Sequence, residues 1–186
     1  METLAYNKYA NNCGPLASIR SAEVTYAEHR AGGTGDSSEL RQHRPYLCST
    51  GCRLHLIRPL GFDISDKAVK RAGLDYWHMV EVFDYENLDD FFAKNDVRQM
   101  WCLSTKAPRS HVEANFEDGC YLFFGKETKG LPEDFLEAHR EACVRIPMRC
   151  EARSLNLSNA VAITVFEALR QLEFPGLQDF GKMRNQ

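Results

Sequence analysis

The sequence predicts an α/β protein in which a mostly parallel sheet carries helices on both faces. Short apolar runs of strand length alternate along the chain with segments of helical periodicity that begin at capping residues. Most of the apolar runs also end in a polar or glycine-containing loop. Parallel sheets bind ligands in the loops at the carboxyl ends of their strands, so these loops are the places to search for a site.

The N-terminal segment is the least regular part of the chain. Residues 31–38 are rich in Gly, Ser and Thr, as flexible linkers are, and the residues around them show no sustained hydrophobic period. We therefore expect residues 1–46 to be an irregular or divergent segment. A domain is expected over residues 47–175, and a tail over residues 176–186.

The first half of the domain is expected to alternate between strands and helices. Pro59 and Gly61 close its first strand, and its helices begin at Ser or Asn, whose side chains accept hydrogen bonds from the free N–H groups of a first turn. Leu88, Phe91 and Phe92 have the spacing of one helix face. The expected order is strand 53–57, helix 65–71, strand 78–83 and helix 87–94.

The second half is expected to continue the alternation and to end in a long helix. Pro132 suits the first turn of a short helix, because proline lacks the N–H that this turn leaves free. The expected order is strand 98–105, strand 119–125, helix 132–139, strand 143–148 and a helix from about residue 155 to residue 172.

The C-terminal helix has no polar face over part of its length. Residues 160–166 are apolar apart from Thr164, and a helix that is apolar all round is covered on more than one side. Its first turn carries Asn156, Ser158 and Asn159, beside free backbone N–H groups. Two interpretations stay open: a ligand loop built against a subunit interface or deep core, or an ordinary buried helix with a Ser/Asn cap.

Composition and charge exclude several function classes. The 186 residues carry a net charge of −3, which argues against a protein that coats nucleic acid but is compatible with a local basic patch. No apolar run reaches the length of about 18 residues that a membrane span needs, so none is expected. The first residues have neither the basic nor the apolar region of a secretion signal.

The cysteines indicate a reducing compartment. Their number, 7, is odd, and most lie inside apolar runs, so we expect buried, reduced thiols in a cytoplasmic protein, with an organelle as the open alternative. Cys48 and Cys52 have no second pair at zinc-binding spacing. No metal is therefore expected.

The loop at residues 124–132 has glycines at a spacing that is typical of phosphate-binding loops. Leu131 and Pro132 follow Gly130, however, where a P-loop needs Lys and then Ser or Thr. Binding of a nucleotide triphosphate is therefore disfavoured. We expect the glycines to let backbone groups approach the edge of a planar ligand, with a plain turn between strand and helix as the alternative.

Several linked segments resemble a known family. Phe124-Gly-Lys-Glu-Thr-Lys-Gly-Leu-Pro132, Ile146-Pro-Met148 and Arg153-Ser-Leu-Asn-Leu-Ser-Asn-Ala-Val161 resemble the second and third signature motifs of SPOUT-class RNA 2′-O-ribose methyltransferases, the SpoU/TrmH superfamily. Arg58-Pro-Leu-Gly-Phe62 and Lys70-Arg-Ala-Gly-Leu-Asp-Tyr76 are similar to the TrmL-type subgroup, which methylates the wobble cytidine or uridine of tRNA. The resemblance covers about residues 50–175.

The resemblance implies a fold, a methyl donor and an assembly. The family fold is an α/β sheet whose C-terminal segment forms a deep trefoil knot, one of the few exceptions to the rule that chains do not knot. The methyl donor is S-adenosylmethionine, bound without a metal. The family's enzymes are homodimers whose active site lies near the dimer interface, and the expected partner is tRNA.

The resemblance also implies roles for individual residues. Ser154 and Asn159 have the chemistry to hydrogen-bond donor or ribose, and Arg153 can hold an RNA phosphate or the reacting hydroxyl. Donor contacts are implied at Leu103, Gly125, Glu127, Ile146, Ser154 and Leu155, and catalytic roles at Arg44, Arg153, Ser154 and Asn159. Basic residues near the first expected helix are a candidate tRNA footprint, with a solvated charged face as the alternative: Arg53, Arg58, Lys67, Lys70 and Arg71.

The family's first motif is missing. A strand, Pro-x-Asn-x-Gly-Asn and then an arginine should come before residue 50, yet the chain has Arg41-Gln-His-Arg-Pro-Tyr-Leu-Cys-Ser49 there. We therefore expect the first β-α unit to be replaced. Two alternatives stay open: Arg44 takes the place of the family's arginine, or the chain is a weak or inactive relative that binds donor or RNA.

Overall fold

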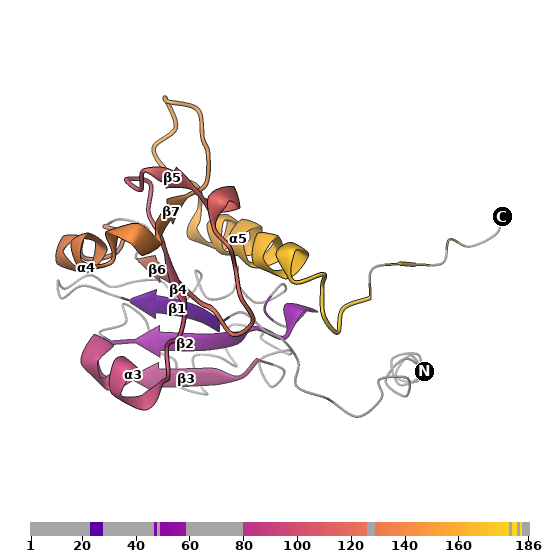
Figure 1. Ribbon diagram of the computed structural model, residues 1–186, viewed down its shortest axis with the longest axis horizontal. Helices are drawn as coiled ribbons and strands as arrows, with labels where there is room; N and C mark the ends of the chain where they lie inside the picture. The colour runs from indigo at the N-terminus through magenta and orange to yellow at the C-terminus, as the bar shows by residue number, and fades with distance from the viewer. Residues whose placement is uncertain are drawn as a thin grey trace, which may run out of the picture.

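The computed structural model describes residues 23–27, 47, 49–58, 80–125, 129–178, 180, 181 and 183. Within them the strands form one sheet in the order β3-β2-β1-β6-β4-β7-β5, and every neighbouring pair is parallel (Figure 1). The strands are β1 (Glu23–Ala27), β2 (Arg53–Ile57), β3 (Val82–Tyr85), β4 (Met100–Leu103), β5 (Arg109–Ser110), β6 (Tyr121–Gly125) and β7 (Cys143–Arg145).

The N-terminal segment contributes a strand, which corrects one expectation. β1 lies between β2 and β6, with Thr25 opposite His55 on one side and Phe123 on the other. The expectation of a replaced first strand is therefore wrong at Glu23–Ala27. The segments on either side of it show no sustained hydrophobic period, and the strand is held by hydrogen-bonding partners that lie far away in the sequence.

Helices pack on both faces of the sheet, as predicted. On one face α3 (Leu88–Lys94) and α4 (Glu133–Ala138) bring Phe91 and Phe135 to Phe123 of β6. On the other face α5 (Leu157–Gln171) packs against Leu122 and Phe124 of the same strand. The alternation of β6 side chains between the two faces divides the core into two layers, with the helices outside them (Figure 1).

Helix starts follow the capping chemistry of the sequence. The side chain of Asn87 accepts the backbone N–H of Asp90 at 2.8 Å and so begins α3. Asn156 does the same for α5, accepting the backbone N–H of Ser158 at 3.0 Å. Two short 3₁₀ turns, His111–Glu113 and Arg140–Ala142, precede β6 and β7.

The predicted strand ends were too long where polar residues and proline follow. β4 and β7 stop at Leu103 and Arg145, before the turn at residues 104–106 and before Pro147. The strand expected at residues 78–83 begins instead at Val82, and β5 has only two residues, too few to produce a periodic signal. The helix expected at residues 65–71 lies outside the described residues.

The described cysteines are free thiols. Cys52, Cys102, Cys120 and Cys143 are buried, as the sequence predicts, whereas Cys150 is exposed. Cys102 and Cys143 face each other in the register of β4 and β7, and burial raises the pKa of both thiols. Both therefore stay protonated at neutral pH. Of the helices in the described part of the chain, none combines the length and apolarity that crossing a membrane requires.

Candidate functional site

A cavity of about 520 Å³ lies at the carboxyl ends of β4, β6 and β7. Three loops that follow these strands form most of its wall, and the starts of α4 and α5 complete it. The lining residues are Leu103, Ser104, Thr105, Lys106, Phe124, Gly125, Lys129, Gly130, Leu131, Glu133, Leu136, Ile146, Met148, Arg153, Ser154, Leu155, Leu157 and Ala160.

The strand order brings the three loops together. β4 lies between β6 and β7, so Leu103 stands opposite Phe124 on one side and Val144 on the other. The ladder continues one residue further, because the N–H of Ser104 donates to the carbonyl of Val144 at 3.0 Å. The chain therefore leaves three neighbouring strands at nearly the same level of the sheet.

Gly125 lies where the chain folds back on itself. A Cβ atom at this position would overlap the backbone of Gly130 and Leu131. Gly130 has φ +70°, a left-handed conformation that favours glycine. The glycine spacing thus serves, first of all, the packing of the loop against its own strand, whereas the sequence had suggested close approach to a ligand.

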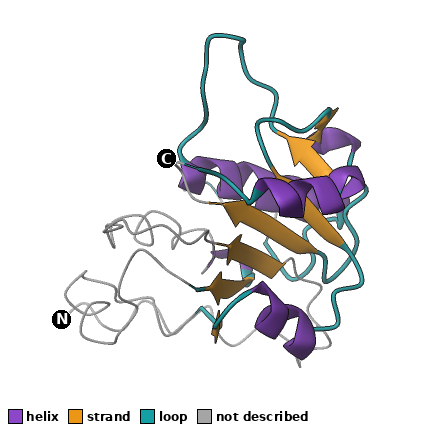
Figure 2. Cartoon of the chain, turned by 90° about the vertical axis from the view of Figure 1, so that its left-hand side faces the viewer, coloured by secondary structure: helices purple, strands orange, loops and turns teal. Residues whose placement is uncertain are grey.

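The loop between β7 and α5 extends away from the body of the protein, and its two ends line the cavity. Figure 2 shows residues 146–156 as a long teal loop that leaves the sheet and returns to the start of α5. Ile146 and Met148 come from its first end, and Arg153, Ser154 and Leu155 from its second end. Arg153 and Ser154 are exposed, so their polar groups are accessible at the mouth of the cavity.

The three polar residues that the sequence places in the first turn of α5 have different surroundings in the structure. The side-chain oxygen of Asn156 accepts both the N–H and the hydroxyl of Ser158, so these two side chains cap the helix. Ser158 is buried. Asn159 is exposed and does not line the cavity.

The predicted site residues are largely brought together. Leu103, Gly125, Ile146, Arg153, Ser154 and Leu155 all line the one cavity. Arg44 and Glu127 lie outside the described residues. The sequence assigned no role to Lys106 or Glu133, and Met148 was named only as part of a motif, but all three line the cavity. Residues of these types are common on protein surfaces and in cores. Only the fold shows that these three line the cavity.

The charges on the cavity wall are uneven. Lys106 forms an ion pair with Glu133. Lys129 and Arg153 also line the cavity, and neither forms an ion pair with a residue in the described part of the chain. The described wall therefore carries two uncompensated positive charges, which favour an anionic partner at its mouth.

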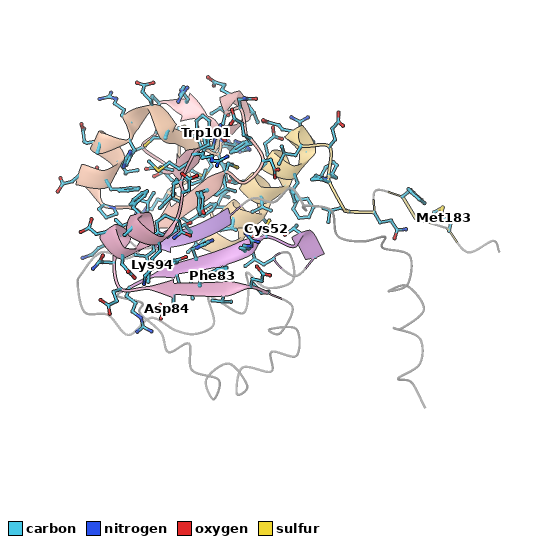
Figure 3. All side chains as sticks on the ribbon, turned by 60° about the horizontal axis from the view of Figure 1, so that its bottom comes forward. Cys52, Phe83, Asp84, Lys94, Trp101 and Met183 are labelled. Carbon is cyan, nitrogen blue, oxygen red and sulfur yellow. The ribbon has the colours of Figure 1, made fainter. Side chains whose placement is uncertain are left out.

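Two residues of the predicted basic footprint are engaged elsewhere. Arg53 pairs with Glu81 at 2.8 Å. Asp84 lies on the edge strand β3 (Figure 3). Arg58 contacts both of its carboxylate oxygens, and Asp84 raises the pKa of the Arg58 guanidinium. Their charges are locally balanced, which weakens the case for these two residues as RNA contacts. Lys67, Lys70 and Arg71 lie outside the described residues.

A family sequence profile covers most of this architecture. Residues 47–166 match the profile of the SpoU rRNA Methylase family. The chain belongs to the SpoU rRNA Methylase family. The matched residues run from just before β2 into α5 and include all three cavity loops.

Curated SpoU-family relatives are similar over most of their length. The tRNA (cytidine(34)-2′-O)-methyltransferase of Saccharophagus degradans is 48% identical over 129 residues, which are 69% of this chain and 84% of the relative. The enzyme of the same name from Escherichia coli is 45% identical over 132 residues, 70% of this chain and 84% of the relative.

Solved SpoU-family structures share the fold. A putative RNA methyltransferase from Bacillus anthracis has a TM-score of 0.77 and 38% identity, covering 86% of this chain and 98% of the other. A structure from work on 2-OH methylation of C/U34 on tRNA has a TM-score of 0.71 and 35% identity, covering 83% of this chain and 97% of the other.

Proposed function

We propose that this chain transfers the methyl group of S-adenosylmethionine to the ribose 2′-hydroxyl of the wobble nucleotide, cytidine or uridine, of tRNA. The observation that carries the proposal is the convergence of three strand-end loops on one cavity, with six of the residues that the sequence motifs assign to the site in its wall. The names of the similar relatives support the same reaction.

The cavity suits a donor with a nucleoside and an amino-acid end. Its volume of about 520 Å³ lies inside the range of about 300 to 1,000 Å³ that is usual for small-molecule sites. Leu103, Ile146 and Leu155 offer apolar surface for a base, while loop backbone groups and the Ser154 hydroxyl offer hydrogen bonds to polar atoms. The donor supplies a methyl group that is already activated by the sulfonium charge.

The chain's own residues have three tasks in this reaction. The apolar side chains in the wall, among them Leu103, Ile146 and Leu155, exclude water around the bound donor, which strengthens the charge interactions there. Ser154 holds the donor in orientation, since its hydroxyl lies at the cavity mouth and is exposed. Arg153, beside it, binds the RNA phosphate or the reacting hydroxyl and stabilises the negative charge that develops on the ribose oxygen.

The rim of the cavity is suited to an RNA backbone. Lys129 comes from the second loop and Arg153 from the third, so their charges reach the mouth from two loops. RNA phosphates are the natural partners of such groups, and contacts of this kind set position rather than sequence choice. In this proposal the two residues position the tRNA while the target ribose enters the site.

In this proposal the enzyme is a homodimer. α5 keeps Ile163 and Phe166 at 40% and 43% exposure, one helical turn apart, and apolar side chains of this size gain by being covered. A second copy packed on α5 covers them. The proposal also includes the C-terminal trefoil knot, which agrees with the position of β7 between the earlier strands β4 and β5. It includes activity in the cytoplasm as well, which agrees with the free thiols of the described cysteines.

The test is methyl transfer to tRNA by the full-length chain. S-adenosylmethionine with a labelled methyl group is incubated with tRNA carrying C34 or U34, and with the same tRNA whose nucleotide 34 already carries the 2′-O-methyl group. Label in the first tRNA and not in the second is expected. Donor binding by calorimetry without any transfer would instead support the alternative of a catalytically inactive donor- or RNA-binding protein.

A further inference from the structure

The ion pair between Lys106 and Glu133 joins two walls of the donor cavity. Lys106 belongs to the loop after β4, whereas Glu133 is the first residue of α4. A second, smaller cavity of about 190 Å³ lies beside the first one, and Ser104, Lys106, Glu133 and Leu136 line both. The ion pair therefore stands on the boundary between the two cavities.

Hydrogen bonds donated by backbone N–H groups fix the chain at both ends of the pair. Ser104 accepts the N–H of Lys106 on its hydroxyl at 3.3 Å and the N–H of Ala107 on its carbonyl at 3.2 Å, which closes a tight turn. On the other side, Glu133 follows Pro132, whose carbonyl accepts the N–H of Leu136 at 3.0 Å. The two side chains thus connect two fixed segments of backbone, the turn after β4 and the start of α4.

Global stability does not explain this contact. The side chains of Lys106 and Glu133 are 67% and 63% exposed, and exposed ion pairs contribute little to folding because water and salt screen them. Breaking the contact therefore changes the local arrangement of the loop and helix rather than the folded fraction. The part of the protein that this local change affects first is the cavity wall, to which both residues contribute.

We propose that Lys106 and Glu133 are positioning residues that hold the loop after β4 against the start of α4 and so define the donor cavity. This inference rests on the proposed function, because the occupant of the cavity is the methyl donor. Without the pair the boundary between the two cavities opens, water enters, and the donor is held less tightly. The effect is on donor binding and not on binding of tRNA.

The experiment measures donor affinity in full-length variants by calorimetry with S-adenosylmethionine. K106Q and E133Q are each expected to raise the Kd two- to fivefold, as loss of an exposed ion pair worth up to about 1 kcal/mol implies. K106R, which keeps the pair, and the charge-swapped K106E/E133K variant are expected to bind within twofold of the wild type. Urea unfolding of all variants checks that the fold is unchanged.

A matched control comes from α3. Lys94 pairs with Asp90 at 2.7 Å and is 59% exposed. It lies on α3 (Figure 3) and lines neither cavity. K94Q is therefore expected to leave the donor Kd unchanged. In kinetic assays, K106Q and E133Q are expected to raise the KM for the donor, with the KM for tRNA and the kcat at saturating donor unchanged.

The outcomes that overturn the inference can be told apart. Weaker binding in K106Q but not in E133Q would mean that Lys106 contacts the donor directly, as would failure of the swapped variant to recover. Wild-type affinity in both single variants would mean that the pair has no positioning role. Absence of donor binding by the wild-type chain would overturn the proposed function itself and this inference with it.

Discussion

Gly125 is the most constrained single residue of the candidate site. Its φ is not in the left-handed region, so its need for glycine comes from space alone. The backbone of Gly130 and Leu131 fills the position that a Cβ would occupy, and backbone atoms cannot move aside by rotating as a side chain does. The residue links the end of β6 to the wall of the cavity.

We expect Gly125→Ala to destabilise the fold by about 1 to 3 kcal/mol, the usual cost of overpacking, and to weaken donor binding. The second loop must shift to make room, and it lines the cavity. Urea unfolding and donor calorimetry measure the two effects. Gly181→Ala is the control, because a Cβ there meets no atom within 4 Å. Equal behaviour of the two variants would contradict this account.

Ser154 provides a second prediction at this scale. Its side chain is exposed at the cavity mouth, so Ser154→Ala should leave the urea midpoint unchanged while raising the donor Kd about two- to tenfold, the usual worth of one neutral hydrogen bond. Ser154→Thr keeps the hydroxyl and is expected to retain most of the affinity. Unchanged affinity in the alanine variant would remove Ser154 from the donor site.

At the scale of elements, α5 connects the cavity to the far end of the sheet. Its first turn borders the cavity, and its last turn holds the loop before β6 through Gln171. The side-chain oxygen of Gln171 accepts the N–H of Phe116 at 3.0 Å, and its amide nitrogen donates to the carbonyl of Ala114 at 3.0 Å. One helix thus fixes two connections that are distant in sequence.

Glu167 on α5 predicts a pH dependence of stability. Arg170 donates to both of its carboxylate oxygens at 2.8 Å and lowers the pKa of Glu167 from 4.5 to about 2. A lowered folded-state pKa stabilises the fold above pH 4.5, and this contribution is lost as the pH falls toward 2. Because Arg170 is 60% exposed, we expect about 1 kcal/mol.

The measurement is urea unfolding of the wild type and Glu167→Gln at several pH values. The variant should be less stable than the wild type at pH 7, and the difference should shrink as the pH falls from about 4.5 toward 2. A difference that is constant across this range would show that the charge of Glu167 plays no part. Protein concentration is held constant, because assembly also affects apparent stability.

At the scale of the whole molecule, the exposed apolar residues of α5 predict the assembly. If the proposed homodimer forms through α5, Ile163→Glu combined with Phe166→Glu is expected to leave only monomer, since a two-fold interface would bury both charges twice. Light scattering after size-exclusion chromatography gives the mass, and circular dichroism checks the fold. Phe83→Gln is the control, because Phe83 is 41% exposed on the edge strand β3. A wild-type monomer would refute the dimer.

Much of the fold could be predicted because its signals are local. β2 and β6 are short, largely apolar segments, α3 has apolar residues at helical spacing, and Asn87 and Asn156 cap two helix starts. β1 could not be predicted in the same way, since the segments beside it show no hydrophobic period and its place in the sheet depends on pairing with β2 and β6. Strand ends were also uncertain, because ladder pairing and not periodicity determines where a strand stops.

For the candidate site, the sequence predicted the loops better than the roles of single residues. Leu103, Gly125, Ile146 and Ser154 were expected in the site and line the cavity. Asn159 does not reach it, because helical geometry turns its side chain away from the neighbouring loop end. Arg53 of β2 and Arg58 just after it were candidates for a tRNA footprint or a solvated charged face, and acidic residues on and next to β3 balance their charges.

The amino-acid sequence by itself determined the α/β class, the motif loops and the family to which they belong, since these depend on residue type and short spacing. Only the tertiary structure decided that β1 completes the sheet, that Gly125 packs against its own loop, and that Lys106 meets Glu133. Each of these depends on contacts between residues far apart in the chain. Local periodicity carries no information about which distant segments will pair.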